Sequence, residues 1–323
     1  MNPFLWIPIG LGGAGVLALL TATVCFLRVF YLPREAASEE IKIPDGEEYE
    51  PFREQMVAWV KQTRAMPHRA VQIRSHDGLR LCGKLYLFSE AAPLEILFHG
   101  YRGNAERDLS GGVARCFALG HSALIVDQRG CGSSEGHTAT FGILESRDCE
   151  CWVRFAAEEL CPNVPIILTG ISMGAATVLM CAERELPDAV VGVLADCGYT
   201  SARAIICKVI RDMRLPPRLL YPFVRLGARL FGGFDPDSAS ALAAMKRSRL
   251  PILFFHGLSD GFVPHEMSEK NYAACVTDKH LVLTPEAGHG LCFPVDGEGY
   301  LREMHAFFDP ITDEKSQKMQ INV

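Results

Sequence analysis

The chain has 323 residues and a mass of 35.5 kDa, which suits one large α/β domain or two average domains. Apolar residues make up 49% and charged residues 22%, and this balance excludes long disordered or collagen-like segments. A net charge of −6 without a basic block argues against nucleic-acid binding. The 12 cysteines are irregularly spaced and too sparse for a disulfide scaffold, so we expect reduced thiols.

The N-terminal residues 1–32 are predicted to form a retained transmembrane anchor. Residues 2–27 are 26 consecutive residues without Asp, Glu, Lys, Arg or His. As a helix this stretch would be roughly 39 Å long, enough to cross a hydrocarbon core of about 30 Å. A cleaved signal peptide is the alternative, but no basic residue precedes the stretch. Arg28, Arg34 and Lys42 follow it, so the positive-inside rule predicts a single pass with the remaining chain in the cytoplasm.

Residues 33–68 are predicted to be a linker followed by a short helix. The first part is polar and acidic and contains several prolines, which is typical of a connecting segment. Phe52, Met56, Trp59 and Val60 then recur at helical spacing, so we expect an amphipathic helix there.

From residue 69 the pattern changes to strands and helices. Residues 71–73 and 79–88 read as an antiparallel hairpin, and short apolar runs then alternate with helical stretches. The expected strands are 94–98, 123–126, 165–168, 190–194, 252–255 and 281–283, and the expected helices are 105–119, 142–160, 173–186, 264–276 and 297–308. This alternation predicts an α/β fold with a mostly parallel sheet and helices on both faces. The core would comprise residues 69–198 and 250–310, with a helical insertion at 199–249 and a tail at 311–323.

The sequence Gly170-Ile171-Ser172-Met173-Gly174 matches the G-x-S-x-G pattern of a nucleophile elbow. The pattern alone is weak evidence, but here it follows an expected strand and opens an expected helix, as the elbow requires. The glycines permit a sharp, strained turn. The alternative is a helix N-cap serine beside packing glycines. We favour Ser172 as a nucleophile.

A serine nucleophile needs a general base and an acid that orients the base. His289 follows the expected strand 281–283 and lies between two glycines, so we predict that it is the base. Two carboxylates follow strands at the same sheet edge. Asp260 is the predicted acid because it lies one strand before His289, and Asp196 is the alternative.

Two backbone N–H groups are predicted to form an oxyanion hole. One belongs to Met173, directly after the nucleophile, and the other to Tyr101, in the loop after the strand 94–98. His99, in the same loop, is expected to be structural.

Taken together, these motifs resemble the α/β-hydrolase superfamily. They are His99-Gly100, Asp127-Gln128-Arg129-Gly130-Cys131-Gly132-Ser133-Ser134, the Ser172 motif, His256-Gly257-Leu258-Ser259-Asp260 and Gly288-His289. The sequence is most similar to the membrane-anchored, bacterial Bem46-like branch. The resemblance implies an eight-stranded sheet, a Ser-His-Asp triad, no metal or organic cofactor, and an insertion that caps the site. It does not define the substrate.

The sequence therefore predicts a membrane-anchored serine hydrolase that cleaves carboxylic esters. Its expected partners are a small ester or acyl substrate and membrane lipid, and no oligomeric state is predicted. The apolar side chains of the insertion suggest an acyl or aromatic pocket. The arginines of the insertion are either a solvated face or a contact for anionic lipid headgroups or acidic acyl substrates. The alternatives are a peptidase, amidase or thioesterase with the same triad, and a non-catalytic binding protein.

Overall fold

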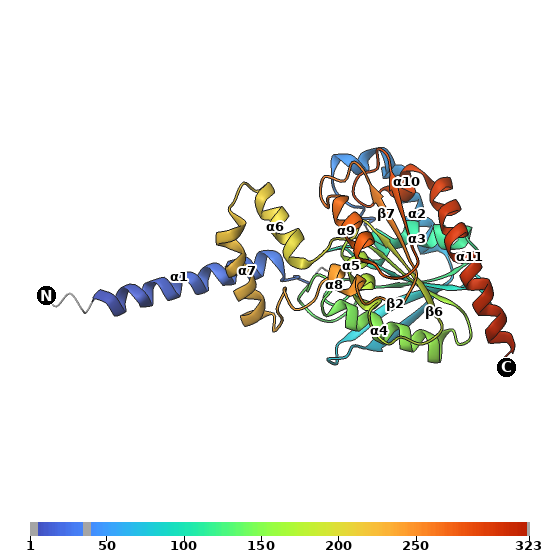
Figure 1. Ribbon diagram of the computed structural model, residues 1–323, viewed down its shortest axis with the longest axis horizontal. Coiled ribbons are helices and arrows are strands. Elements are labelled where there is room, and N and C mark those ends of the chain that lie inside the picture. The colour runs from blue at the N-terminus through green and yellow to red at the C-terminus, as the bar shows by residue number, and fades with distance from the viewer. Residues whose placement is uncertain (1–5, 35–39, 322–323) are drawn as a thin grey trace.

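The structure is a computed structural model that describes residues 6–34 and 40–321, with side chains for 13–34 and 40–319. The first five residues of the predicted anchor and the last two of the predicted tail lie outside this description. The described chain forms a sheet domain from which the first helix projects together with part of the insertion (Figure 1). The predicted α/β class is confirmed.

Eight strands form one sheet in the order β1-β2-β4-β3-β5-β6-β7-β8. The strands are β1 (Arg69–Arg74), β2 (Arg80–Tyr86), β3 (Leu94–Phe98), β4 (Ser122–Val126), β5 (Ile166–Ile171), β6 (Val190–Asp196), β7 (Ile252–Gly257) and β8 (Lys279–Thr284). Strand β2 pairs antiparallel with β1 and β4, and all other pairs are parallel. The carboxyl ends of the parallel strands therefore meet at one edge of the sheet, where open α/β sheets place their sites.

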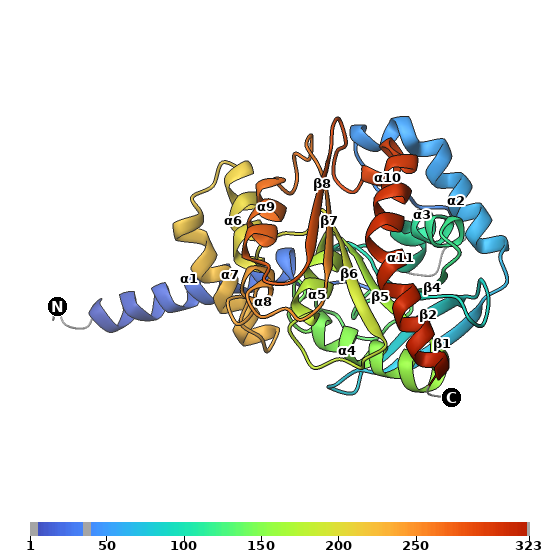
Figure 2. The ribbon, with the colours of Figure 1, turned by 45° about the vertical axis from the view of Figure 1, so that its right-hand side comes forward.

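Helices cover both faces of the sheet (Figure 2). They are α1 (Trp6–Val29), η2 (Glu47–Phe52), α2 (Arg53–Ala65), α3 (Ala105–Ala118), α4 (Glu145–Phe155), η3 (Ala156–Leu160), α5 (Met173–Cys181), α6 (Ala202–Asp212), α7 (Pro217–Phe231), α8 (Ala241–Met245), α9 (Glu266–Ala274), α10 (Cys292–Val295) and α11 (Gly297–Ile321). Helices α3 and α11 pack on one face, where apolar residues of the sheet meet Val113 and Phe308. Helices α4, α5 and α9 cover the opposite face, and α2 lies on α3.

The first helix packs against the insertion. Ala22, Cys25 and Phe26 of α1 are buried, and the ring of Phe26 lies 5.7 Å from that of Phe231 in α7. Gly227 permits the close crossing, because a Cβ atom there would lie 2.4 Å from the carbonyl oxygen of Ala22. Within the described residues, no helix combines the length and the apolar character needed to cross a membrane.

Two segments differ from the sequence prediction. The tail predicted at 311–323 continues helix α11 up to Ile321, because Thr312 and its neighbours extend the buried stripe begun by Met304 and Phe308. The insertion is helical as predicted, but α7 crosses α1 and α6 packs on α7 (Figure 1). Helix α7 packs on α1, and most of the apolar side chains that were expected to build a pocket are exposed.

Candidate active site

The backbone around Ser172 is strained as a nucleophile elbow requires. Ser172 has φ 56° and ψ −114° between strand β5 and helix α5. A Cβ atom at Gly170 would lie 2.1 Å from the carbonyl oxygen of Gly174, and one at Gly174 would lie 2.0 Å from that of Phe98. Any larger residue at either position would clash with backbone, so both glycines are needed for the turn that presents Ser172.

The structure brings the three side chains of the predicted triad together. His289 Nε2 lies 2.9 Å from Ser172 Oγ, and His289 Nδ1 lies 2.7 Å from Asp260 Oδ2. Asp260 follows β7, His289 follows β8, and Ser172 directly follows β5, so all three lie at the carboxyl edge of the sheet. This geometry allows the imidazole to accept the serine proton while the carboxylate holds the imidazole in place.

Several donors surround the Asp260 carboxylate. Its Oδ1 accepts hydrogen bonds from the N–H groups of Phe262 at 2.9 Å and Val263 at 2.8 Å. Its Oδ2 also lies 3.2 Å from His256 Nε2. Burial alone would raise the pKa of Asp260, but hydrogen bonds from His256 and His289 hold it well below its usual value. Asp260 is therefore a carboxylate able to stabilise a protonated His289.

Asp196, the alternative acid, has different partners. Its Oδ2 accepts a hydrogen bond from the Tyr300 hydroxyl at 3.1 Å, and its backbone carbonyl accepts from the Ser172 N–H at 2.9 Å. Burial raises the pKa of its carboxyl group. Of the two carboxylates, Asp260 is the one hydrogen-bonded to His289.

The two predicted oxyanion donors are both available. No described residue accepts a hydrogen bond from the N–H of Tyr101 or Met173, whereas the N–H of Gly100 is bonded to Asp108 Oδ2 at 3.1 Å. His99 is buried, and its Nε2 accepts from the Gln128 N–H at 3.0 Å. His99 therefore supports the loop, in agreement with the structural role expected for it.

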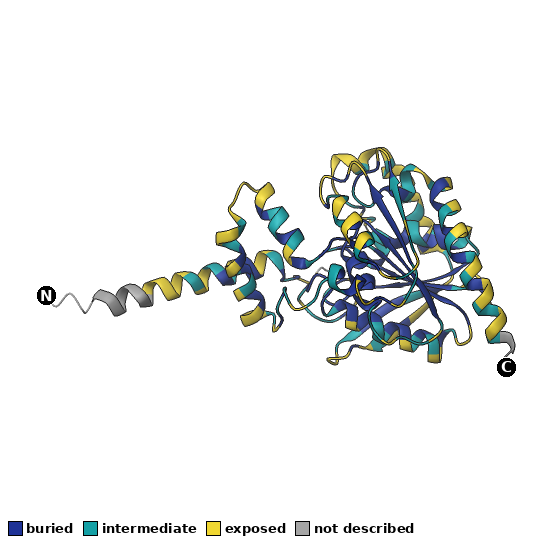
Figure 3. Ribbon diagram, viewed as in Figure 1, coloured by how far each residue is buried: buried dark blue, intermediate teal, exposed yellow. Residues whose placement is uncertain are grey.

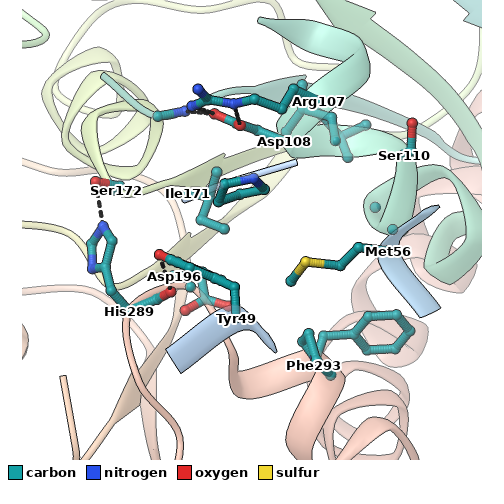
Figure 4. A pocket seen from close by; sticks show the side chains of 18 of the residues that line it. Tyr49, Met56, Arg107, Asp108, Ser110, Ile171, Ser172, Asp196, His289 and Phe293 are labelled. Carbon is teal, nitrogen blue, oxygen red and sulfur yellow. Dashed lines mark hydrogen bonds and ion pairs between the residues drawn. The ribbon is translucent and has the colours of Figure 1, made fainter. Parts of the chain in front are cut away.

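A cavity of about 410 Å³ opens at Ser172 and runs along the sheet face that α3 and α11 cover. In Figure 4, Ser172 and His289 lie at one end, and Met56 and Phe293 lie across the cavity from them. Its apolar lining includes Pro44, Met56, Trp59, Leu97, Leu109, Ile171, Phe262, Phe293 and Pro294. None of the described residues from 199–249 lines it.

Sequence reasoning missed the part that η2 and α2 play at this site. Tyr49 lines the cavity, and its hydroxyl donates a hydrogen bond to the His289 carbonyl at 2.9 Å. Burial raises the pKa of Tyr49 well above its usual value. The helical spacing of Met56 and Trp59 indicated an apolar face, but nothing in the sequence indicated that this face covers the site.

Two groups of described residues bring possible metal-binding atoms close together. One is Cys197, Asp260 and His289, and the other is His76, Asp77 and Asp148. In the first, Asp260 and His289 are bonded to each other. In the second, both carboxylates are bonded to Arg129. The carboxylates of both groups are thus already engaged within the protein.

Comparison with known proteins agrees with this architecture. The chain is 28% identical to the uncharacterized protein YqkD of Bacillus subtilis (strain 168) over 196 residues, which are 60% of this chain and 64% of YqkD. The chain thus spans slightly less than two thirds of that relative. The fold of this chain is similar to that of an esterase from Pyrococcus furiosus. The TM-score is 0.62 at 20% identity, and the match covers 88% of this chain and 98% of the esterase.

The fold is also similar to that of Est1E from Butyrivibrio proteoclasticus, whose structure has ferulic acid bound. The TM-score is 0.55 at 20% identity, with 73% of this chain and 98% of Est1E covered. The model of the alpha/beta hydrolase family matches residues 96–303, which include Ser172, Asp260 and His289. This match covers more than half of the sequence, and the chain therefore belongs to the alpha/beta hydrolase family.

Proposed function

We propose that this protein is a serine hydrolase that cleaves carboxylic esters through an acyl-enzyme intermediate on Ser172. The observation that carries the proposal is the 2.9 Å contact between His289 Nε2 and the hydroxyl of Ser172, which a strained turn presents at the cavity. The hydrolase family and the esterases of similar fold favour ester cleavage.

The first half of the reaction transfers the acyl group to the enzyme. His289 Nε2 takes the hydroxyl proton of Ser172 as its oxygen attacks the ester carbonyl carbon. The negative charge that develops on the carbonyl oxygen is stabilised by the N–H groups of Tyr101 and Met173. The tetrahedral intermediate then collapses. The bond to the alcohol oxygen breaks, and His289 gives its proton to the departing alcohol.

The second half releases the acid. His289 Nε2 takes a proton from water, whose oxygen attacks the acyl carbon. The bond to Ser172 then breaks, the serine oxygen regains the proton from His289, and the carboxylic acid leaves. Asp260 stays ionised throughout, because the donors around it stabilise the carboxylate.

The test is labelling with a fluorophosphonate probe together with hydrolysis of p-nitrophenyl esters. Ser172→Ala should abolish labelling and lower kcat by at least three orders of magnitude. The matched control is Ser238→Ala, an exposed serine in the loop between α7 and α8, which should be labelled as the wild type is. A folded wild-type protein that takes up no label would contradict the proposal and favour a binding protein. Faster cleavage of p-nitroanilides or thioesters would reassign the bond that is cleaved.

We further propose that residues 1–32 anchor the protein at a membrane, as in the Bem46-like branch, with the hydrolase domain in the cytoplasm. Of the 17 exposed large apolar side chains in the described residues, 12 lie on α1 or between residues 213 and 231. They are Val16, Leu17, Leu19, Leu20, Val24, Leu27, Met213, Leu215, Leu219, Leu226, Leu230 and Phe231. Figure 3 displays exposed positions along α1 and α7, where both project from the sheet domain. Such a concentration of apolar surface is typical of a docking site.

The charges on the same surface favour an anionic bilayer as the occupant. Four exposed arginines there make no ion pair with any described residue: Arg28, Arg211, Arg214 and Arg218. Guanidinium groups beside exposed apolar side chains suit the headgroup region of anionic lipid. All 12 cysteines are free, which supports a reducing compartment.

Flotation of the full chain with vesicles tests the anchor. The wild type should float with phosphatidylcholine vesicles, and more completely when phosphatidylglycerol is added. Leu20→Asp/Val24→Asp should shift the protein to the soluble fraction, whereas the control Leu87→Asp/Phe88→Asp, on exposed apolar residues elsewhere, should not. A wild-type chain that does not float, or one that only self-associates, would contradict the proposal. Digestion of the domain by protease added outside intact spheroplasts would contradict the cytoplasmic orientation.

A further inference from the structure

The loop after β3, residues 99–103, supplies one predicted oxyanion donor, and we call it the oxyanion loop. It is bonded to the C-terminal end of α1. The Tyr101 hydroxyl donates a hydrogen bond to the Val29 carbonyl at 2.6 Å, and the Arg102 guanidinium donates to the Arg28 carbonyl at 2.9 Å. Burial raises the pKa of Tyr101, so its hydroxyl keeps the proton that this bond needs. Two consecutive side chains of the oxyanion loop thus reach the same helix end.

These bonds satisfy groups that the end of a helix leaves free. The last carbonyl groups of a helix have no partner within the helix, and the negative end of the helix dipole favours a cation. Arg28 and Val29 are the last two residues of α1. Arg102 brings a positive charge to them and also donates to the Tyr31 carbonyl at 3.3 Å, just beyond the helix. The oxyanion loop therefore caps the C-terminus of α1.

The segment that follows α1 is fixed in the sheet domain, so the helix end has a defined position. The Leu32 N–H donates to the His137 carbonyl at 2.8 Å, and the Ala139 N–H donates to the Phe30 carbonyl at 2.9 Å. Phe30 is completely buried, and its ring lies 5.7 Å from that of Phe141.

The Tyr101 side chain belongs to the same packed group. Its ring stacks on Phe141 at 5.0 Å between centroids, and the Arg102 guanidinium lies 5.2 Å from the ring centre. Arg102 has φ 54°, a left-handed conformation that is strained for arginine and persists only where the surroundings hold it. Because the side chain and the N–H of Tyr101 share one Cα atom, contacts that fix the side chain also limit the direction of the N–H. The position of α1 therefore bears on the oxyanion donor.

We propose that Tyr101 and Arg102 are positioning residues whose side chains connect α1 to the oxyanion hole, so that α1 supports catalysis as well as the proposed membrane attachment. This inference rests on the proposed esterase function, in which the Tyr101 N–H stabilises the oxyanion. Such a donor acts only at hydrogen-bonding distance from the charge that develops in the transition state. Without the contacts to α1 the donor can shift, and the cost falls on kcat rather than on KM.

The test is the double variant Tyr101→Phe/Arg102→Met of the full chain in phosphatidylcholine vesicles, assayed with p-nitrophenyl butyrate. It removes the bonds to α1 and keeps both backbone N–H groups. We expect kcat to fall by at least about tenfold at an unchanged KM, since a small displacement of a catalytic group is costly. The loss should stay below the roughly hundred- to thousandfold effect of deleting one oxyanion donor outright.

The matched control is Tyr221→Phe/Arg74→Met, which removes the same chemical groups elsewhere. The Tyr221 hydroxyl donates to Asp237 at 2.6 Å, and Arg74 Nη1 donates to the Gly78 carbonyl at 2.9 Å. Neither side chain lines the cavity or contacts the oxyanion loop. This control should keep the kcat of the wild type.

Inhibition by an alkyl trifluoromethyl ketone distinguishes a shifted donor from a loss of folded enzyme. Ser172 Oγ forms a bond to the ketone carbon, its proton passes to His289 Nε2, and the carbonyl electron pair moves to the oxygen, which becomes an oxyanion. The inhibition constant should therefore rise in the double variant by the factor by which kcat/KM falls. A partly unfolded variant would have a lower kcat but the inhibition constant of the wild type.

The outcomes separate this inference from the esterase proposal. Absence of fluorophosphonate labelling in the folded wild type would contradict the esterase. Labelling together with a wild-type kcat in Tyr101→Phe/Arg102→Met would overturn the connection to α1 alone. A reduced kcat with an unchanged inhibition constant, or an equal loss in the control variant, would also overturn it.

Discussion

Two segments of the molecule have positions that differ from the roles their sequences suggested. Residues 44–59 looked like a linker and a surface helix, yet they line the cavity through Tyr49, Met56 and Trp59. The insertion at 199–249 looked like the cover of the site, yet α7 packs on α1. An amphipathic pattern shows that a helix has an apolar face, but the pattern does not show which partner covers that face.

Both segments nevertheless contact residues around the predicted triad. The Tyr49 hydroxyl binds the His289 carbonyl, on the cavity side. On the insertion side, Lys208 donates to the Gly261 carbonyl, and its ammonium group lies 5.9 Å from the centre of the Phe262 ring. That ring contacts His289 edge-on, at 5.1 Å between centroids. We therefore expect strong effects at the proposed triad and weaker effects within each segment.

The largest effect on kcat is expected at Asp260, the predicted acid of the triad. Asp260→Asn removes the carboxylate that orients His289 and should lower kcat by three to four orders of magnitude. Tyr49→Phe removes only the bond to the His289 carbonyl and should lower kcat by less than about tenfold. Steady-state kinetics with p-nitrophenyl esters measure both. Equal losses in the two variants would show that Tyr49, too, holds the imidazole in its reactive position.

The free energy of unfolding at low pH should depend on the buried ion pair between Glu95 and Arg115. Burial would raise the pKa of Glu95, but the Arg115 charge and the bond to His121 lower it from 4.5 to about 2. Because the folded pKa is depressed, the stabilisation is fully present above about pH 4.5 and is lost as the pH falls toward 2. It amounts to roughly 3 kcal/mol, since one pKa unit corresponds to about 1.4 kcal/mol.

Urea unfolding between pH 2 and 6 measures this contribution. Glu95→Gln should be less stable at neutral pH, because it leaves Arg115 buried without its counter-charge. Its free energy of unfolding should also fall less steeply with acid than that of the wild type. Parallel curves for the two proteins would mean that other carboxylates govern the acid sensitivity.

The sequence predicted the elements whose signal is local. Strand β3 was predicted residue for residue as 94–98, because a strand buried on both faces is predominantly apolar, and four of its five residues are. Ser172 was identified because its turn requires two nearby glycines. The choice between Asp260 and Asp196 needed the structure, since both follow strands at the same sheet edge. The contact of Asp196 with Tyr300 joins residues 104 positions apart, and no local pattern encodes it.

Substitutions in the two segments should differ moderately in their effect on the preference for long over short acyl esters. Trp59 lines the cavity and stacks on Phe293 at 5.5 Å, so Trp59→Ala should enlarge the cavity. The ratio of kcat/KM for long and short acyl esters should rise about tenfold, the factor typical of one or two methylenes in an apolar pocket. Leu219→Ala, on the exposed face of α7, should change this ratio by less than about twofold. A larger change of this ratio in Leu219→Ala would indicate that the insertion, too, covers the cavity.

The smallest effect is expected for the link between the insertion and the acid loop. Lys208→Met keeps the length of the side chain but removes both the bond to the Gly261 carbonyl and the cation beside Phe262. Contacts of these kinds contribute up to about 1 kcal/mol, so kcat should fall by at most about fivefold.

If the link acts by positioning the loop, the reduced kcat should come with an unchanged KM on a soluble ester, because Lys208 does not line the cavity. A matched loss in Asp212→Asn, which removes the ion partner of Lys208 at 2.7 Å, would identify the ammonium position as the cause. An unaltered kcat in Lys208→Met would show that the acid loop is held by Asp260 and its backbone donors alone.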